Sequence, residues 1–242
     1  MKNSDIIITG SSGLIGSYLT AHFMSLGRRV VQIDIGNPKP ATGEFKVLDL
    51  RCHDDVNVMC ELYADIPTLI NCFGANDHVR PGEVRGTILD VDTDVFRDML
   101  NDNVVALFNV CKQYAKVRMG RGCRIVNFGA STGIVSPRTD MYGGLHKHVG
   151  YSTSKAAVIH MTRILGTHLI TLDPEMFINC ISPGGIENGQ GKDFMSRYSQ
   201  HTPAHRMGSV ADLVPAIEML IDERNRYMVG EKVVVDGGWC VQ

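Results

Sequence analysis

The chain has 242 residues, 44% of them hydrophobic, and a formal net charge of −2. This length suffices for a substantial buried core and suits one α/β domain. The charge forms no basic or acidic block, which argues against a nucleic-acid partner. No apolar run approaches the roughly 20 residues that span a bilayer, so we expect no membrane association.

The N-terminus and the cysteines indicate a cytoplasmic protein. The first apolar run, Ile6-Ile7-Ile8, is too short for a signal peptide and enters a glycine turn. The seven cysteines are odd in number and show no CxxC spacing, which favours free thiols over disulfides. His146/His148 and His201/His205 have spacings compatible with metal ligands, but no Cys or carboxylate completes either set. We therefore expect no metal site.

Short β-rich runs alternate with longer amphipathic stretches along the chain. The predicted strands cover residues 5–8, 29–34, 45–49, 68–73, 123–128, 176–181 and 232–235. The predicted helices cover residues 14–25, 53–63, 93–117, 151–172 and 210–222. This alternation predicts a doubly wound parallel sheet, a Rossmann fold of about seven strands with helices on both faces.

Two irregular segments interrupt the alternation. Residues 134–150 and 186–208 are rich in Gly, Pro and polar groups, and each follows a predicted strand end. Ligands bind at such ends in open α/β sheets, so we expect both segments to be substrate loops of a single domain, residues 1–242.

The stretch TGSSGLIG, residues 9–16, follows the first predicted strand and opens a helix. In this context Gly10 would permit a tight turn, Gly13 would let a pyrophosphate approach the backbone, and Gly16 would allow close packing of helix on strand. Free N–H groups and the helix dipole would then hold the phosphates.

The second predicted strand ends in Asp34. A carboxylate there can accept hydrogen bonds from both adenosine ribose hydroxyls and would repel a 2′-phosphate. Ile35 and Gly36 follow it, so no adjacent cation would attract that phosphate. The sequence favours NAD over NADP.

Tyr151 and Lys155 are four residues apart on a predicted helix, so their side chains share a face. A tyrosine with a pKa near 10 is a poor base at neutral pH. A lysine ammonium one turn away stabilises the phenolate, so we expect Lys155 to lower the Tyr151 pKa and make it a general acid/base.

An ordered set of motifs spans residues 4 to 240. They are TGxxGxxG, Asp34, Asp49-Leu50, Asn71-Cys72-Phe73-Gly74, Asn103, Tyr-x-x-x-Lys at 151–155, Ser182-Pro183-Gly184 and VVVDGGW. Together they resemble the short-chain dehydrogenase/reductase family in its compact single-domain form.

The resemblance implies roles for the matching residues. Tyr151 would exchange a proton with the substrate, Lys155 would hold the nicotinamide ribose, and Asn103 would anchor a water leading from Lys155 to solvent. Asp49 and Leu50 would meet the adenine, and Asn71 and Gly74 the adenosine-side ribose. The residues expected to surround the dinucleotide are Gly10, Ser12, Gly13, Leu14, Ile15, Asp34, Asp49, Leu50, Asn71, Gly74, Tyr151, Lys155, Pro183, Gly184, Ile186 and Asn188.

Three positions depart from the family pattern. Leu14 stands where compact members carry the middle glycine of TGxxxGxG, with Gly13 preceding it. Ala130 occupies the position expected for the catalytic serine; Ser131 next to it is our candidate, and would need a one-residue bulge. Asn188 replaces a threonine that often holds the cofactor carboxamide, and its amide can bond similarly.

The long 134–150 segment resembles insertions in relatives associated with flagellin glycan modification and nonulosonate sugar synthesis. Its Arg138, Tyr142, His146, Lys147 and His148 suit a polyol or an anionic group. In relatives, the two long helices form a four-helix interface, which implies a homodimer or homotetramer.

We expect an NAD-dependent oxidoreductase that acts on a secondary alcohol or ketone, with sugar and polyol derivatives among the candidates. Ala130 motivates one alternative, a catalytically weakened NAD-binding sensor or partner subunit. The glycine spacing motivates another, an epimerase or dehydratase that retains NAD, although the chain shows no separate C-terminal substrate domain.

Overall fold

The computed structural model describes residues 5–37, 43–76, 86–142 and 146–242. Within these residues, seven parallel strands form one sheet in the order β3-β2-β1-β4-β5-β6-β7. The strands are β1 (Ile6–Thr9), β2 (Val30–Asp34), β3 (Glu44–Val47), β4 (Thr68–Asn71), β5 (Cys123–Phe128), β6 (Met176–Pro183) and β7 (Lys232–Val235). The predicted doubly wound Rossmann fold is confirmed.

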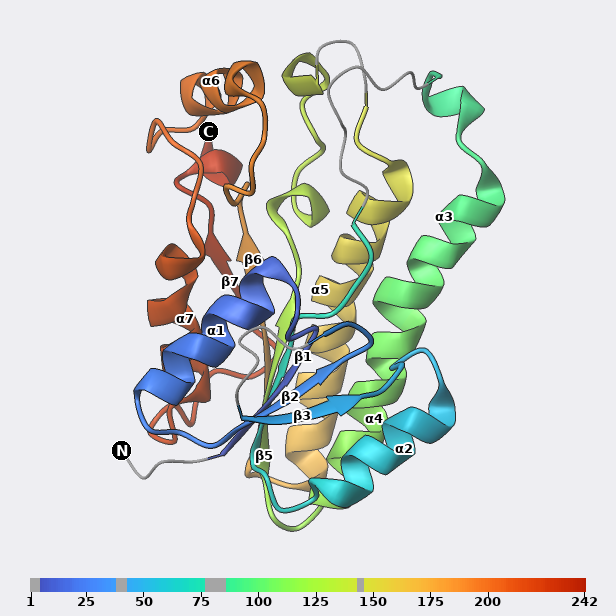
Figure 1. The fold of residues 1–242 in the computed structure, drawn as a ribbon, viewed down its shortest axis with the longest axis vertical. Coiled ribbons are helices and arrows are strands. Elements are labelled where there is room, and N and C mark those ends of the chain that lie inside the picture. The colour runs from blue at the N-terminus through green and yellow to red at the C-terminus, as the bar shows by residue number, and fades with distance from the viewer. Residues whose placement is uncertain (1–4, 38–42, 77–85, 143–145) are drawn as a thin grey trace.

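Helices cover both faces of the sheet (Figure 1). The α-helices of the described residues are α1 (Leu14–Ser25), α2 (His53–Leu62), α3 (Thr93–Leu100), α4 (Ala106–Arg118), α5 (Val149–Leu172), α6 (Lys192–His201) and α7 (Val214–Ile221). Helices α1 and α7 pack on one face, whereas α2, α4 and α5 pack on the other.

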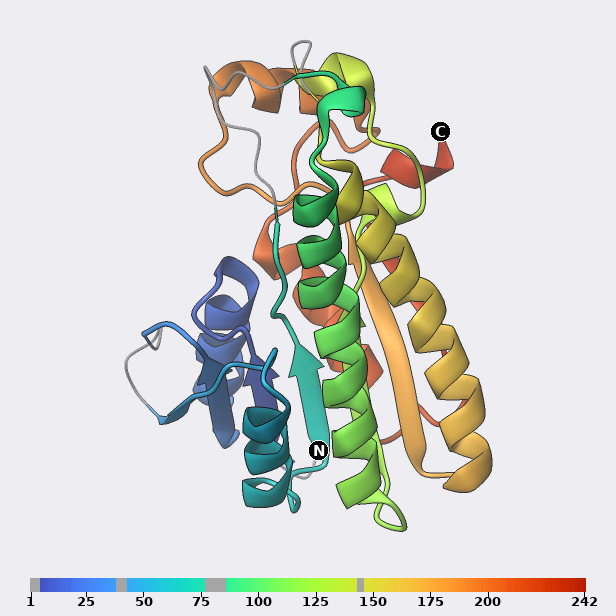
Figure 2. The ribbon, with the colours of Figure 1, turned by 90° about the vertical axis from the view of Figure 1, so that its right-hand side faces the viewer.

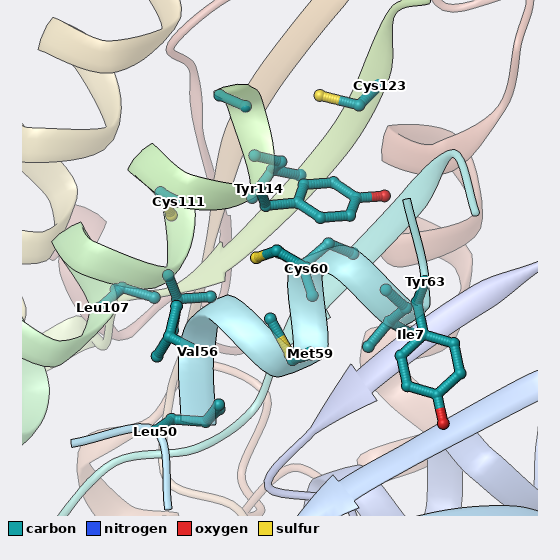
Figure 3. Close-up of a cluster of buried hydrophobic side chains, with 14 of the residues drawn as sticks. Ile7, Leu50, Val56, Met59, Cys60, Tyr63, Leu107, Cys111, Tyr114 and Cys123 are labelled. Atoms are coloured by element: carbon teal, nitrogen blue, oxygen red, sulfur yellow. The ribbon is translucent and has the colours of Figure 1, made fainter. Parts of the chain in front are cut away.

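The apolar run in β1 shows why the sheet is buried on both faces. Ile7 belongs to the core beneath α2 and α4, while Ile6 and Ile8 belong to the core beneath α1 and α7. All three side chains are fully buried. Figure 3 shows the first of these cores, in which Ile7 lies with α2 residues such as Met59 and with Tyr114 of α4.

Several predicted bounds differ from the structure, and the predicted helix 210–222 begins with a 3₁₀ turn, Val210–Leu213, before α7. Two further predicted segments differ in kind. Residues 93–117 do not form one regular helix, because a π-helical turn at Asn101–Val105 separates α3 from α4. The segment 186–208 is not irregular throughout, because α6 occupies Lys192–His201. Its sequence is strongly polar apart from Phe194, Met195 and Tyr198, so its apolar stripe is too narrow to stand out along the chain.

The two segments 134–150 and 186–208 pack against each other above the carboxyl ends of the strands (Figures 1 and 2). Met141 of the 3₁₀ helix Thr139–Tyr142 joins Tyr198 of α6 and Trp239 in a third apolar cluster. The rings of Tyr198 and Trp239 stack with centroids 4.6 Å apart. Residues 143–145 of the first segment lie outside the described residues.

All seven cysteines are free thiols, and Figure 3 shows Cys60, Cys111 and Cys123 among the core side chains. Across the described ranges, no helix has the length and apolarity needed to cross a bilayer. No set of three metal-ligating side chains comes together in that part of the chain either.

Candidate functional site

A continuous groove runs along the carboxyl ends of the central strands. A cavity of about 470 Å³ beside Asp34 adjoins one of about 1040 Å³ beside Tyr151. The two share the lining residues Gly13, Cys72, Phe73, Gly74 and Ala75. These residues follow β1 and β4, between which the strand order reverses, and open α/β sheets bind ligands at this point.

The glycine turn forms the floor of the groove. Gly10 has φ +65°, and a Cβ there would lie 2.5 Å from the backbone nitrogen of Phe73. Gly13 lines both cavities, and the first residues of α1, Leu14, Ile15 and Gly16, line the larger one. The backbone can therefore approach a ligand closely at a helix N-terminus, a geometry that suits phosphate groups.

Ser12 adds a polar group to this turn. It lines the smaller cavity, and its buried hydroxyl has no hydrogen-bond partner among the described residues. Buried hydroxyls are normally hydrogen-bonded, so a ligand oxygen would satisfy this one. The turn and Ser12 fit a phosphate-bearing dinucleotide.

Asp34 also lines the smaller cavity, where the backbone of the glycine turn already orients it. Its carboxylate accepts hydrogen bonds from the N–H of Ser12 (2.8 Å) and of Gly36 (3.0 Å). Asp49 and Leu50 line the same cavity, where the Asp49 carboxylate forms an ion pair with Arg51 (2.8 Å). This arrangement lowers the Asp49 pKa, chiefly through the hydrogen bond from Arg51.

Asn71 is placed differently from the expectation. Its side chain is 1% exposed and lines neither cavity. It accepts a hydrogen bond from the Thr9 hydroxyl (3.1 Å) and donates to Asn127 (2.9 Å), so it joins adjacent strands inside the sheet. The Asn71 side chain therefore does not reach the groove, whereas Gly74, the other residue expected at the ribose, lines it.

Tyr151 and Lys155 lie on α5 and both line the larger cavity. The Lys155 ammonium donates to the Phe128 carbonyl (2.9 Å) and lies 5.8 Å from the centroid of the Tyr151 ring. Burial lowers the pKa of Lys155 to about 8 and raises the pKa of Tyr151 to about 12. The expected lowering of the tyrosine pKa is thus wrong for this state, because desolvation of the phenolate dominates over the distant ammonium.

Asn103 sits in the π-helical turn, a feature frequent at functional sites. Its side-chain amide donates to the Ala75 carbonyl (3.0 Å) and to the Ser154 hydroxyl (2.9 Å), while its oxygen accepts from the Ala75 N–H. Gly74 has φ +147°, and a Cβ there would lie 2.7 Å from the Asn103 oxygen. Asn103 therefore fixes the segment after β4 against α5.

Two hydroxyls follow β5 where one serine is expected. Ala130 is extended, and a 3₁₀ turn at Ser131–Gly133 begins at the next residue in place of the bulge we expected. Ala130, Ser131 and Thr132 all line the larger cavity. The buried Thr132 hydroxyl has no partner among the described residues, which makes Thr132 a second candidate beside Ser131.

The far wall of the larger cavity follows β6. Pro183, Gly184, Ile186 and Asn188 all line it, and a bridge between Ile186 and Gly208 fixes this segment. Trp239, the last residue of the VVVDGGW motif, also lines the cavity, and so does Arg197, which no motif or spacing in the sequence indicates. The packing of α6 and of the chain end over the sheet brings them there.

The profile of the family described as enoyl-(acyl carrier protein) reductase matches residues 15–240. NADPH-dependent aldehyde reductase 2, a chloroplastic protein of Arabidopsis thaliana, is 25% identical over 96% of this chain and 92% of its own length. The 7α-hydroxysteroid dehydrogenase of Bacteroides fragilis is 26% identical over 99% of this chain and 95% of its own.

Among solved structures, a short-chain dehydrogenase from Leptospira borgpetersenii with bound NAD⁺ superimposes with a TM-score of 0.89. The two chains are 26% identical, and the match covers 100% of this chain and 94% of the other. One relative is therefore described with NADPH and another with NAD⁺.

Proposed function

Because the chain belongs to the short-chain dehydrogenase/reductase family, we propose that it is an NAD-dependent oxidoreductase that interconverts a secondary alcohol and its ketone. One observation carries the proposal: Tyr151 and Lys155 line a cavity that continues into the glycine-turn groove. An NAD(P) cofactor follows from the family; the preference for NAD and the roles of individual residues are our proposals.

The groove would hold the dinucleotide with Asp34 at its adenosine end and Tyr151 and Lys155 at its catalytic end. When bound, the cofactor exchanges a hydride with the substrate carbon. The Tyr151 hydroxyl gives its proton to the carbonyl oxygen during reduction. During oxidation the Tyr151 phenolate, formed when the hydroxyl passes its own proton toward Lys155 and solvent, takes the proton of the alcohol. Ser131 or Thr132 donates a hydrogen bond to the same oxygen and stabilises its developing charge.

Lys155 supports this proton exchange. With a pKa of about 8, its side chain gains and loses a proton near neutral pH, and the pKa of about 12 keeps Tyr151 protonated as the donor for reduction. Asn103, which is bonded to Ser154 one residue before Lys155, would anchor the route by which protons reach solvent.

The preference for NAD is supported by the oriented Asp34 carboxylate, because its negative charge would repel the 2′-phosphate of NADP. Arg51, the one cation in the described lining of this cavity, forms an ion pair with Asp49. We propose that segments 134–150 and 186–208 form the substrate walls of a single domain. A role in flagellin or nonulosonate sugar modification and a cytoplasmic location stay predictions.

Replacing Tyr151 with Phe tests the catalytic proposal. A panel of secondary alcohols, hydroxy acids and polyols is screened with NAD⁺, and kcat is measured for the best substrate. Loss of the proton donor should lower kcat by roughly 10²- to 10⁴-fold, with the Kd for NADH unchanged. Tyr227→Phe is the matched control, because Tyr227 is 99% exposed.

Undiminished turnover by Tyr151→Phe would contradict the proton-transfer role. Tight NADH binding by a wild type that turns over nothing in the panel would favour the sensor alternative. Turnover without net NADH change, with cofactor retained through purification, would favour an epimerase or dehydratase.

A further inference from the structure

The groove changes the sign of its charge along its length. The smaller cavity is lined by the carboxylates Asp34, Asp49 and Asp102, with Arg51 as its one cation among the described residues. The larger cavity has one carboxylate in its described lining, Asp193, and five basic side chains. These are Arg138, Lys147, Lys155, Lys192 and Arg197.

Arg197 has guanidinium N–H donors without a partner among the described residues. Its Nε donates to the Met141 carbonyl (3.0 Å), which ties α6 to the 3₁₀ helix opposite. It forms no ion pair within the described part of the chain, in contrast to Arg138, which pairs with Asp140 (3.2 Å). A guanidinium has five N–H donors, and its fork geometry matches a carboxylate or phosphate.

Lys147 places a second cation beside the reacting group. Its Nζ lies 4.4 Å from the centroid of the Tyr151 ring and donates to the Asn76 side chain (2.5 Å). An anion near Lys147 would therefore be held close to the oxygen that Tyr151 protonates. The positive charge belongs to the substrate end of the groove.

The donor chemistry of this wall distinguishes an anion from a neutral polyol. Arginine and lysine only donate hydrogen bonds, whereas a sugar hydroxyl both donates and accepts. Carboxylates and phosphates only accept, so they satisfy such a wall completely. The aromatic side chains Phe194, Tyr198 and Trp239 also line the cavity, and low-dielectric walls strengthen the attraction between the cations and a bound anion.

We propose that the substrate is an alcohol bearing an oxyanion, a carboxylate or phosphate, which Arg197 and Lys147 bind near the carbon that is oxidised. This substrate class rests on the proposed oxidoreductase function. Arg197 and Lys147 are specificity-determining residues: they hold the anion, and Tyr151 serves the reacting oxygen.

Anion binding can be measured without turnover, because the chain has a single tryptophan and Trp239 lines the cavity. NAD⁺-saturated protein is titrated with butyrate, ethyl phosphate and neutral butyramide, and Trp239 fluorescence is followed. Saturation with NAD⁺ fills the phosphate sites of the dinucleotide, so the anions report on the substrate end. The anion that binds more tightly identifies carboxylate or phosphate as the natural group.

At least one anion should bind about tenfold or more tightly than butyramide, the difference expected from a charge-assisted hydrogen bond. Arg197→Gln and Lys147→Gln should each weaken that binding about tenfold. Arg121→Gln is the matched control, because Arg121 is exposed in the loop between α4 and β5 and does not line either cavity. Arg197→Gln also removes the hydrogen bond from Arg197 to the Met141 carbonyl, which ties α6 to the 3₁₀ helix Thr139–Tyr142. Lys147→Gln keeps that hydrogen bond, so it tests anion binding independently of the position of α6.

Equal affinity for butyrate, ethyl phosphate and butyramide, or no saturable response to any of them, would overturn the proposal. Unchanged anion affinity in both variants would do the same. These outcomes are separable from failure of the oxidoreductase proposal, since Tyr151→Phe should lose turnover and keep anion binding. A protein that binds anions but shows no Tyr151-dependent turnover would leave the anion site standing and remove the catalytic role.

Discussion

At the residue scale, Lys155 illustrates how a catalytic group is held at an energetic cost. Its side chain is 9% exposed, and the described contact of its ammonium is with the uncharged Phe128 carbonyl. Burial disfavours the charged form and lowers the pKa from 10.5 to about 8. Folding therefore pushes the proton off this lysine at a pH where an exposed lysine would keep it.

This pKa shift predicts a specific pH dependence of stability. Between pH 8 and 10.5 the unfolded chain keeps the Lys155 proton while the native state loses it, so the Lys155 contribution to the free energy of unfolding should rise with pH. The buried thiols, such as Cys111 and Cys123, contribute with the opposite sign above pH 9, so the Lys155 contribution is read as the difference between wild type and Lys155→Met. The shift corresponds to on the order of 3 kcal/mol across that window. Lys155→Met should lack this rise, measured as urea unfolding from pH 7 to 10.5.

Lys116→Met is the matched control, because Lys116 is exposed on α4 and should leave the wild-type pH dependence intact. Identical pH profiles for wild type and Lys155→Met would show that Lys155 is not the buried titrating group.

Asp34 is the residue on which cofactor preference should depend. Asp34→Ala should raise the KM for NAD⁺ by roughly ten- to a hundredfold, since one or two hydrogen bonds to a charged group are lost. It should also reduce discrimination against NADP⁺, whose 2′-phosphate no longer meets a carboxylate. Arg51→Gln should leave the preference unchanged, because Arg51 is paired with Asp49; a wild type that prefers NADPH would refute the assignment.

At the scale of elements, local sequence predicted most helices and strands, and the misses have identifiable causes. Strands β5 and β7 and helix α1 have the predicted bounds, because each is a compact apolar run flanked by turn residues. The π-helical turn at Asn101–Val105 was not predicted, because a helical turn with one extra residue needs no residue type that distinguishes it from an α-helix. Hydrogen bonds fix the position of this turn: the Asn103 side chain donates to the Ala75 carbonyl and accepts from the Ala75 N–H, 28 residues earlier in the chain.

Helix α6 was missed because its stability comes from outside its own sequence. Tyr198 stacks on Trp239 and accepts a hydrogen bond from the Gly185 N–H (2.6 Å), and Arg197 reaches the Met141 carbonyl. These partners are distant in the chain and give no local signal. The same packing brings Arg197 to the cavity, so its part in the proposed anion site was not predictable as a motif, whereas Lys147 was among the residues that the sequence assigned to a polyol or an anionic group.

At the scale of the whole molecule, apolar residues remain exposed on the long helices that the sequence associated with an interface. They are Val95, Val105, Phe108, Ile164 and Leu172, with exposed fractions between 43% and 58%. Single exposed apolar residues are ordinary, but several on neighbouring helices support our proposal of a homodimer or homotetramer.

Phe108→Glu should shift the wild-type oligomer toward smaller species in light scattering coupled to size-exclusion chromatography, because a carboxylate would be buried in the interface. Leu26→Glu is the control, since Leu26 is similarly exposed but follows α1. A monomeric wild type, or an unchanged oligomer in Phe108→Glu, would contradict an interface at α4.

The sequence by itself determined the parallel doubly wound fold, the glycine turn, Asp34 and the Tyr151/Lys155 pair, because periodicity and short spacings encode strands, turns and helix faces locally. Tertiary structure alone decided three further points: that the Asn71 side chain is inside the sheet, that Thr132 joins Ser131 at the cavity, and that desolvation sets the pKa of Tyr151 and Lys155. It also decided that, among the described residues, five basic side chains and one carboxylate line the larger cavity. Burial, hydrogen-bond partners and the set of charged side chains in a cavity depend on residues from distant parts of the chain. A local sequence pattern therefore cannot predict them.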